Sequence, residues 1–275
     1  MIAVLGAGPI GAAIAHRLAE RGRVSDVRLI DENPGIAQGK ALDIRQSGPI
    51  DGSDVRLSGA SDPIDAASAD VIVLADDTVG GAWDGDRGLR LIEKLVRAGS
   101  TAPFVFAAPS QLPLMESAAR ELHVSVDRLV GTAASAIEPI VASFVNIELG
   151  QTGASVTVTG RPPSFVIGWS SATIGGGLVT ERVAPHRLLA ISQALPRLWP
   201  PGAQAIAAPT ALVIEALVSG SRRLLSAVTI LGDELGARGR AGLLPVSLGN
   251  GKVLARTVPS LSPQERNEAM TQLMR

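Results

Sequence analysis

The stretch that decides the fold is Ile2-Ala3-Val4-Leu5-Gly6-Ala7-Gly8-Pro9-Ile10-Gly11, which is continued by Val27-Arg28-Leu29-Ile30-Asp31. The first four residues form an apolar run that predicts a buried strand, and the residues after Gly11 are rich in helix formers. The second apolar run ends on Asp31, twenty residues after Gly11. Strand, G-x-G-x-x-G, helix, strand and terminal acid together form the dinucleotide-binding fingerprint in its full context.

Each part of this fingerprint has a physical role. Gly6 permits a tight turn, Gly8 lets the backbone approach a pyrophosphate, and Gly11 lets the helix lie close to the strand. The free N–H groups and partial positive charge of a helix N-terminus attract phosphates. Asp31 can accept hydrogen bonds from the adenine-side ribose and repels a 2′-phosphate, so the sequence predicts NAD rather than NADP. The predicted cofactor contacts from this unit are Gly6, Ala7, Gly8, Pro9, Ile10, Gly11 and Asp31.

Composition narrows the classes of function. The 275 residues are enough for two subdomains, and 46% hydrophobic residues indicate a globular protein. A net charge of −1, with no run of more than two Lys or Arg residues, argues against nucleic acid and membranes as partners. Disulfides and thiolate metal sites are excluded because there is no cysteine, and we expect no metal because the histidines lack ligand spacing. Neither a signal peptide nor a run of transmembrane length is recognisable, so we expect a cytoplasmic protein.

Apolar and helical segments alternate through the first half of the chain. Strands are predicted at residues 27–30, 55–57, 71–74 and 104–108, and helices at residues 36–44, 89–97 and 112–122. Residues 76–88 carry four glycines and few apolar side chains, which indicates a flexible loop. A long helix over residues 133–149 should lead into the second half. This alternation predicts an α/β fold with a parallel sheet and helices on both faces.

The second half has a different pattern. Residues 155–159 alternate as a half-exposed strand does, and Pro162 and Pro163 should end that strand. Asn250-Gly251 is a strong hairpin signal. Ser262-Pro263-Gln264-Glu265 has the form of a capping box with proline at the first helical position. Further strands are predicted at residues 165–170, 224–231 and 243–248, and helices at residues 188–195 and 211–217.

The chain resembles the malate/lactate dehydrogenase family along nearly its whole length. The segments that carry the resemblance are Asn33-Pro34-Gly35-Ile36-Ala37-Gln38-Gly39-Lys40-Ala41-Leu42-Asp43, Ser47-Gly48-Pro49-Ile50, Ile147-Glu148-Leu149-Gly150, Pro245-Val246-Ser247-Leu248-Gly249 and Leu261-Ser262-Pro263-Gln264-Glu265. The resemblance implies a Rossmann domain with a doubly wound parallel sheet over residues 1–149. An α+β, lactate/malate dehydrogenase-like substrate domain would then cover residues 150–275. It also implies NAD, with Ala75 and Ala108 among its contacts, and a homodimer or tetramer.

The family interconverts 2-hydroxy and 2-keto acids, and this chemistry needs a proton donor, a carboxylate that orients it, and arginines that bind the substrate carboxylate. By the resemblance, the histidine that exchanges the proton would occupy the position of Pro162. The orienting aspartate and a substrate arginine would occupy the positions of Ile137 and Ile140. Glu138 lies one residue late, a turn of about 100° around the helix, so it should point elsewhere. The residues of the family's catalytic centre are therefore absent from the matching positions.

Other residues can be considered as substitutes. Arg87 belongs to the loop that carries arginines in the family, and Arg161 adjoins the position of the missing histidine, so both are candidates to bind a small carboxylate. An arginine at a strand end is more often simply solvated. We expect none of His16, His123 and His186 to be catalytic.

Two hypotheses follow. The first is an NAD(H)-binding family member that lacks standard 2-hydroxy acid dehydrogenase activity, which would make it a pseudoenzyme or nucleotide sensor. The alternative is an active NAD-dependent oxidoreductase, acting on a 2-hydroxy or 2-keto acid or another small substrate through a rebuilt site. Its candidate residues are Asp84, Asp86, Arg87 and Arg161.

Overall fold

The strands of the first half form one parallel sheet. The computed structural model describes residues 1–78 and 81–274. The strands in this half are β1 (Ile2–Leu5), β2 (Asp26–Ile30), β3 (Arg56–Ala60), β4 (Val71–Leu74), β5 (Phe104–Phe106) and β6 (Leu129–Gly131). Their order in space is β3-β2-β1-β4-β5-β6, and every neighbouring pair is parallel. The strand order reverses between β1 and β4, so the loops that follow these two strands meet at one edge, where doubly wound sheets bind their ligands.

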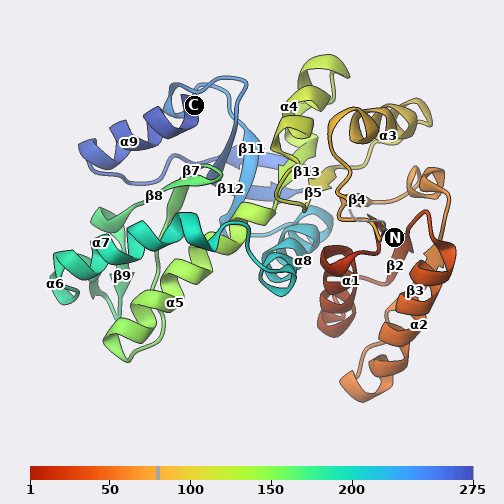
Figure 1. Ribbon diagram of the computed structural model, residues 1–275, viewed down its shortest axis with the longest axis horizontal. Coiled ribbons are helices and arrows are strands. Elements are labelled where there is room, and N and C mark those ends of the chain that lie inside the picture. Colours follow the sequence, from red (N-terminus) through yellow and green to blue (C-terminus); the bar gives the residue numbers. More distant parts are fainter. Residues whose placement is uncertain (79–80, 275) are drawn as a thin grey trace.

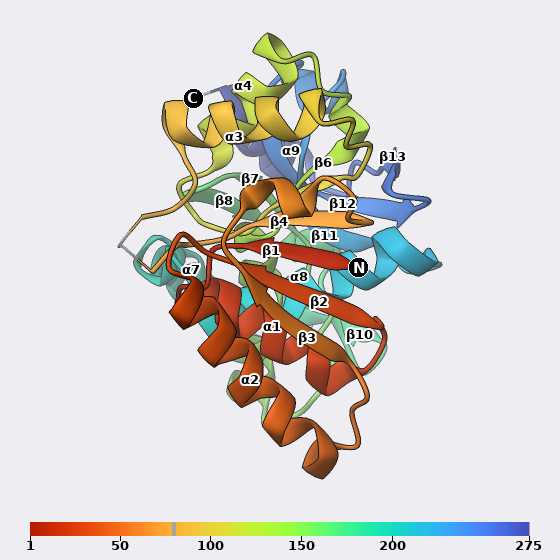
Figure 2. The same ribbon diagram turned by 90° about the vertical axis from the view of Figure 1, so that its right-hand side faces the viewer.

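Helices cover both faces of this sheet, as the alternation predicted (Figure 2). They are α1 (Pro9–Arg21), α2 (Pro34–Asp51), α3 (Gly85–Arg97), α4 (Leu112–Glu121) and α5 (Ile137–Leu149). The side chain of Asn33 caps α2 by accepting a hydrogen bond from the backbone N–H of Ile36. The helix expected over residues 36–44 therefore starts earlier, and it continues past Pro49 until Gly52 ends it with a positive φ. Residues 133–136 form a 3₁₀ turn before α5, so the expected connecting helix is shorter by one turn.

The second half extends the same sheet with antiparallel strands (Figure 1). These strands are β7 (Val158–Arg161), β8 (Ser164–Ile167), β11 (Leu225–Ile230), β12 (Ala241–Gly249) and β13 (Lys252–Arg256). β11 pairs with β6, the order continues through β12, β7 and β8, and β13 pairs with β12. The hairpin at Asn250 and Gly251 is confirmed, and both residues have a positive φ. The strand expected at residues 155–159 begins only at Val158.

The remaining elements of the second half pack on this extended sheet and on the first half. They are the short hairpin β9 (Thr173–Ile174) and β10 (Gly177–Leu178), and the helices α6 (Val179–Arg182), α7 (Pro185–Ala194), α8 (Ala203–Ser219) and α9 (Pro263–Met274). The hairpin and α6 were not predicted. The capping box of α9 is confirmed, because the backbone N–H of Ser262 donates to Glu265 and the backbone N–H of Glu265 donates to the hydroxyl of Ser262. On α8, Glu215 accepts two hydrogen bonds from Arg21 at the end of α1.

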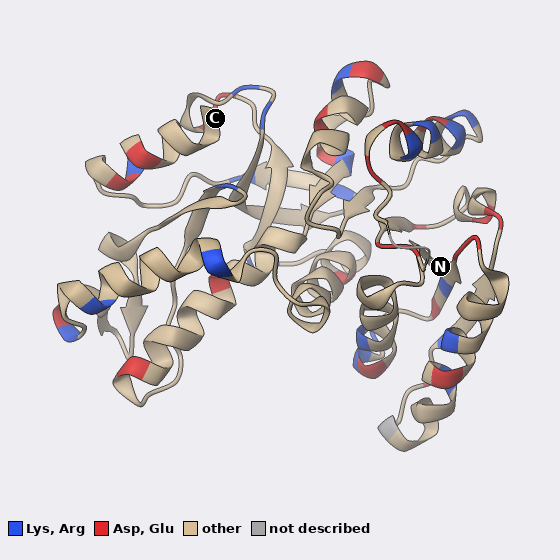
Figure 3. Ribbon diagram, in the orientation of Figure 1, with Lys and Arg blue, Asp and Glu red and all other residues tan. Residues whose placement is uncertain are grey.

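The core has two main layers, one on each side of the sheet. One layer joins β1, α1 and α8 through side chains such as Ile14, Leu18, Ile214 and Leu217, all fully buried. The other packs α3, α4 and α5 against the opposite face. No single helix within residues 1–78 and 81–274 is long and apolar enough to cross a membrane, and only α7 with its following turn and α8, bent by 95°, pass that test together. Basic and acidic residues are interspersed along the ribbon, and acidic residues lie on the loops after β2 and β4 (Figure 3).

Candidate functional site

The glycine loop after β1 has the backbone geometry that its sequence predicted. Gly6 has a φ of 109°, and a Cβ there would lie 2.2 Å from the backbone oxygen of Asp76. A Cβ on Gly11 would lie 1.9 Å from the backbone oxygen of Gly6. Neither distance is possible between real atoms, so only glycine fits at these two positions. The loop is thereby held against the end of β4, and Ala75 donates its backbone N–H to Leu5 at 2.9 Å.

The N-terminus of α1 binds an anion, and that anion comes from the protein itself. The carboxylate of Asp76, directly after β4 and Ala75, accepts hydrogen bonds from the backbone N–H groups of Ile10 at 2.9 and 3.1 Å and of Gly11 at 3.0 Å. The backbone oxygen of Asp76 accepts from the N–H of Gly8 at 2.9 Å. A negative charge is favoured here because the helix N-terminus offers free donors and a partial positive charge. The donor set therefore fits the phosphates of a dinucleotide, and in this structure the carboxylate of Asp76 binds it.

Asp31, at the end of β2, is only 1% exposed and its carboxylate oxygens accept four hydrogen bonds. The backbone N–H groups of Ala7 and Thr78 donate to one oxygen at 2.8 and 3.2 Å. The backbone N–H of Asn33 and the hydroxyl of Thr78 donate to the other at 3.0 and 2.7 Å. Burial raises the pKa of Asp31, but the hydrogen bonds from Thr78, Ala7 and Asn33 outweigh it and hold the pKa below its ordinary value. Asp31 is thus ionised and suited to accept from ribose hydroxyls.

Arg87 lies at this same edge. Its guanidinium forms an ion pair with the buried side chain of Asp77 and another with Glu32 at 2.9 Å, and it stacks 4.0 Å above the ring centroid of Trp83. On the opposite side of the glycine loop, the ammonium of Lys40 donates to the backbone oxygen of Ala7 at 2.5 Å. Hydrogen bonds and ion pairs therefore hold the described part of the loop that was expected over residues 76–88. Residues 79–80 lie outside the described residues.

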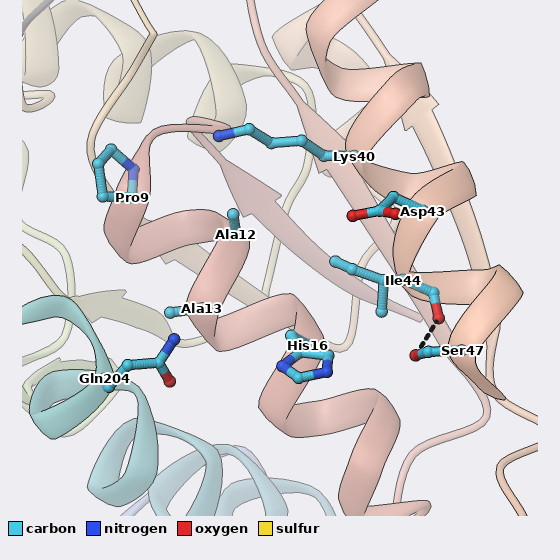
Figure 4. Close-up of a pocket in the computed structure, with 9 residues that line it drawn as sticks. All are labelled: Pro9, Ala12, Ala13, His16, Lys40, Asp43, Ile44, Ser47 and Gln204. Carbon is cyan, nitrogen blue, oxygen red and sulfur yellow. Dashed lines mark hydrogen bonds between the residues drawn. The ribbon is translucent and has the colours of Figure 1, made fainter. Parts of the chain in front are cut away.

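A cavity of about 370 Å³ lies beside the glycine loop, between α1, α2 and α8 (Figure 4). Its lining residues are Pro9, Ala12, Ala13, His16, Lys40, Asp43, Ile44, Ser47 and Gln204. Figure 4 shows Lys40 of α2 reaching back toward the glycine loop, with His16 further along α1. Asp31 and Asp76 do not line this cavity, so it differs from the surface at which a dinucleotide would meet them.

Hydrogen bonds of Gln111 hold the segment that follows β5. The backbone N–H of Ala108 donates to the side-chain oxygen of Gln111 at 3.0 Å, and the amide of Gln111 donates to the backbone oxygen of Trp83 at 2.9 Å. Gln111 is fully buried. It therefore connects the end of β5 to the loop that leads into α3.

The three positions that the resemblance gives to catalytic residues lie directly after β7 and on α5. Pro162 directly follows β7 and is half-buried. Ile137 and Ile140 lie in the first turn of α5, with Ile137 fully buried in the core and Ile140 half-buried. Glu138 also points into the protein and accepts from the backbone N–H of Val158 at 3.2 Å, at the opposite end of β7 from Pro162. Burial raises the pKa of Glu138 above its ordinary value.

Arg161, at the end of β7, is paired within the fold. Its guanidinium makes two hydrogen bonds to the carboxylate of Glu116 on α4 and one to the backbone oxygen of Ala241 at 3.0 Å. The side chains of Arg161 and Glu116 are 16% and 12% exposed. Arg161 and Arg87 thus bind different carboxylates of the protein, Arg161 that of Glu116 and Arg87 those of Asp77 and Glu32.

His16, His123 and His186 are all exposed. Among residues 1–78 and 81–274, no group of three or more His, Cys, Asp and Glu side chains could hold a metal ion.

Comparisons with known proteins agree with this geometry. Residues 1–79 match the family model for the lactate/malate dehydrogenase NAD binding domain. The malate dehydrogenase of Chlorobium phaeobacteroides is 27% identical, over 96% of this chain and 92% of that protein. These matches support the malate/lactate dehydrogenase family that the sequence resembles. NAD is the cofactor of its nucleotide-binding domain.

Solved structures of malate dehydrogenases share the fold of this chain. The enzyme from Salinibacter ruber superposes with a TM-score of 0.87 at 24% identity, covering 98% of this chain and 93% of that one. The enzyme from Aeropyrum pernix gives 0.88 at 20% identity, covering 99% and 95%. The expected α/β Rossmann fold is therefore confirmed.

Sequence reasoning missed the residues that occupy this site. Asp76, Thr78, Gln111 and Glu116 were not predicted to have a role. One signal was available for the first of them. Asp76 is the second residue after β4. Because the strand order reverses between β1 and β4, the end of β4 lies beside the phosphate loop that follows β1.

Proposed function

We propose that this protein binds NAD(H) but does not interconvert malate or lactate with the corresponding keto acids. Bound NAD would accept or supply a hydride. The remaining chemistry must come from side chains that move a proton at the substrate oxygen and stabilise its charge. The observation that carries the proposal is the replacement of both members of the proton-transfer pair, by Pro162 and Ile137.

Neither replacement can perform the lost step. Proline has no proton to exchange. Ile137 is fully buried among apolar side chains, so no carboxylate is available there to orient a base. General acid–base catalysis contributes about 10²–10⁴-fold to a rate, and stabilisation of an oxyanion can add a similar factor.

The two candidate substrate arginines support the same proposal. Arg87 is paired with Asp77 and Glu32, and Arg161 is paired with Glu116. A guanidinium that already binds carboxylates of the protein must break those bonds before it can bind the carboxylate of a substrate. Neither arginine is prepared for that role.

The alternative is an active dehydrogenase with a rebuilt site, and the names of three curated relatives, each a malate dehydrogenase, favour it. The two proposals are separated by following NADH oxidation with pyruvate and with oxaloacetate, each against a blank without protein. We expect no rate above the blank. Turnover above roughly 1 s⁻¹, which is ordinary for an enzyme, would support the alternative and end the first proposal.

We also propose a homodimer or tetramer, and a division into domains after Leu149. The exposed apolar side chains of Leu42 on α2 and Ile147 on α5, 44% and 74% exposed, support an interface on these helices. The end of α5 at Gly150, which has a φ of 59°, supports the domain boundary. A monomer by light scattering at micromolar concentration would contradict the assembly.

A further inference from the structure

We propose that residues 76–78 are an internal competitor of the cofactor. Asp76 takes the place of a phosphate on the N-terminus of α1, and Thr78 takes the place of a ribose hydroxyl on Asp31. NAD(H) then binds only after this segment releases both groups. This inference rests on NAD(H) binding, as the proposed function does, and adds what opposes it.

The hydrogen bonds at the N-terminus of α1 support the first half of this proposal. The N–H groups of Ile10 and Gly11 are the free donors of the first turn of α1, and the carboxylate of Asp76 accepts from both within 3.1 Å. A phosphate that reached the same donors would meet this carboxylate at hydrogen-bond distance. Two negative charges at hydrogen-bond distance from one another repel, so they cannot share these donors.

The carboxyl group of Asp76 also lies close to Gly8. A Cβ built on Gly8 would lie 2.5 and 2.6 Å from carboxyl atoms of Asp76. The space that glycine leaves open in this loop is the space through which a pyrophosphate approaches the backbone. Here the side chain of Asp76 fills it.

The hydrogen bonds to Asp31 support the second half of the proposal. The hydroxyl of Thr78 donates to Asp31 at 2.7 Å, as a ribose hydroxyl would, and its backbone N–H adds a second bond to the other oxygen. With Ala7 and Asn33 as further donors, each carboxylate oxygen of Asp31 already accepts two hydrogen bonds. A ribose can therefore bind Asp31 only by displacing Thr78.

Asp77, between these two residues, is held in place by Arg87. The backbone N–H of Asp77 donates to the backbone oxygen of Gly81 at 2.8 Å, and its carboxylate accepts from Gly81 and Arg87. Arg87 in turn binds Glu32, directly after Asp31. This arrangement keeps Asp76 and Thr78 in position on either side, so the competition is a property of the whole segment.

The test is a titration of each variant with NADH by calorimetry. Asp76→Ala should bind NADH about tenfold tighter than the unaltered protein or more, the change expected when a charge-assisted hydrogen-bonded competitor is removed. Asp76→Asn keeps the size of the side chain and one acceptor for α1, so it guards against a folding defect and should also bind more tightly. Thr78→Val should gain affinity by a smaller, several-fold factor. Asp65→Ala, which removes an exposed acid of the same half, should change the affinity less than twofold.

A crystal structure of the unaltered protein with NADH gives a second readout. We expect the carboxylate of Asp76 to have left the N–H groups of Ile10 and Gly11. A bound cofactor with both hydrogen bonds intact would overturn the inference, as would equal or weaker NADH binding by both Asp76 variants. If none of the proteins binds NADH, the inference and NAD(H) binding fail together. Turnover of pyruvate or oxaloacetate would contradict the proposed function alone.

Discussion

The edge of the sheet at β1 and β4 and the end of β7 have diverged in different ways. At the cofactor edge the glycine loop, the helix N-terminus and Asp31 are all present. Their hydrogen-bonding groups are already bound by residues of the protein, among them Asp76 and Thr78. Pro162, after β7, and Ile137, on α5, occupy the positions that the resemblance gives to catalytic residues, and Arg161 forms an ion pair with Glu116. One region keeps its binding groups and fills them. The other presents a proline, a buried isoleucine and an arginine that is already paired.

The difference shows what each region still requires. The glycines cannot be replaced without moving the backbone, so they would persist even in a protein that rarely binds NAD. The side chains for proton transfer have no such structural role, because an apolar residue in the core at Ile137 stabilises the fold at least as well as a buried carboxylate. Retention of the fingerprint alone therefore does not show that chemistry is retained.

The largest expected effect concerns catalysis. We expect Pro162→His to leave NADH oxidation with pyruvate or oxaloacetate at the level of the blank, about 10⁴-fold or more below an ordinary family rate. A histidine restored there would have no carboxylate at Ile137 to orient it. Substituting Ile137→Asp in the same protein is the matched comparison. Recovery by Pro162→His alone would mean that another group orients the imidazole.

The next effect concerns the ion pair that holds Arg161. We expect Glu116→Gln to lower the free energy of unfolding by about 3 kcal/mol, because it leaves a mostly buried guanidinium without its counter-charge and weakens the acceptor of the Ala241 N–H. Urea denaturation measures this change. Glu93→Gln, which breaks the exposed pair with Arg97, should cost no more than about 0.5 kcal/mol. Equal costs for the two variants would show that Arg161 is not a structural residue.

Asp31 tests the cofactor edge directly. Asp31→Ala should weaken NADH binding by about 1.5–3 kcal/mol, or roughly 10–150-fold, because a charged acceptor for the ribose is lost. It should also relax the preference for NADH over NADPH, because the charge that repels a 2′-phosphate disappears. Calorimetric titration with both cofactors measures each effect. Tighter binding of NADPH than NADH by the unaltered protein would contradict this account of Asp31.

These regions also differ in how far the sequence could predict them. The glycine loop, Asp31 and the capping box of α9 depend on residues close together in the chain, so their spacing carries the information. The bonds of Asp76 to α1 join residues more than sixty positions apart, and the pair of Arg161 with Glu116 joins residues forty-five apart. Such contacts depend on which strand ends meet in the finished sheet. The sequence therefore predicted the strand, glycine loop and helix of this unit, and it missed Asp76 and Thr78, which form hydrogen bonds with it.

The smallest expected effect is a dependence of stability on pH at Glu138. Burial raises its pKa in the folded protein above the unfolded value, so the folded state holds the proton more tightly. The contribution of Glu138 to stability is therefore most favourable at pH values below about 4.5, and declines as the pH rises from there through the folded pKa. Glu138→Gln, which resembles the protonated acid and can still accept from Val158, should remove this decline and be more stable than the unaltered protein at neutral pH. Urea denaturation between pH 4 and pH 8 measures the difference, with the exposed Glu268→Gln as the control. If the stabilities of the unaltered protein and Glu138→Gln run parallel over this range, Glu138 is not titrating within the fold as its burial requires.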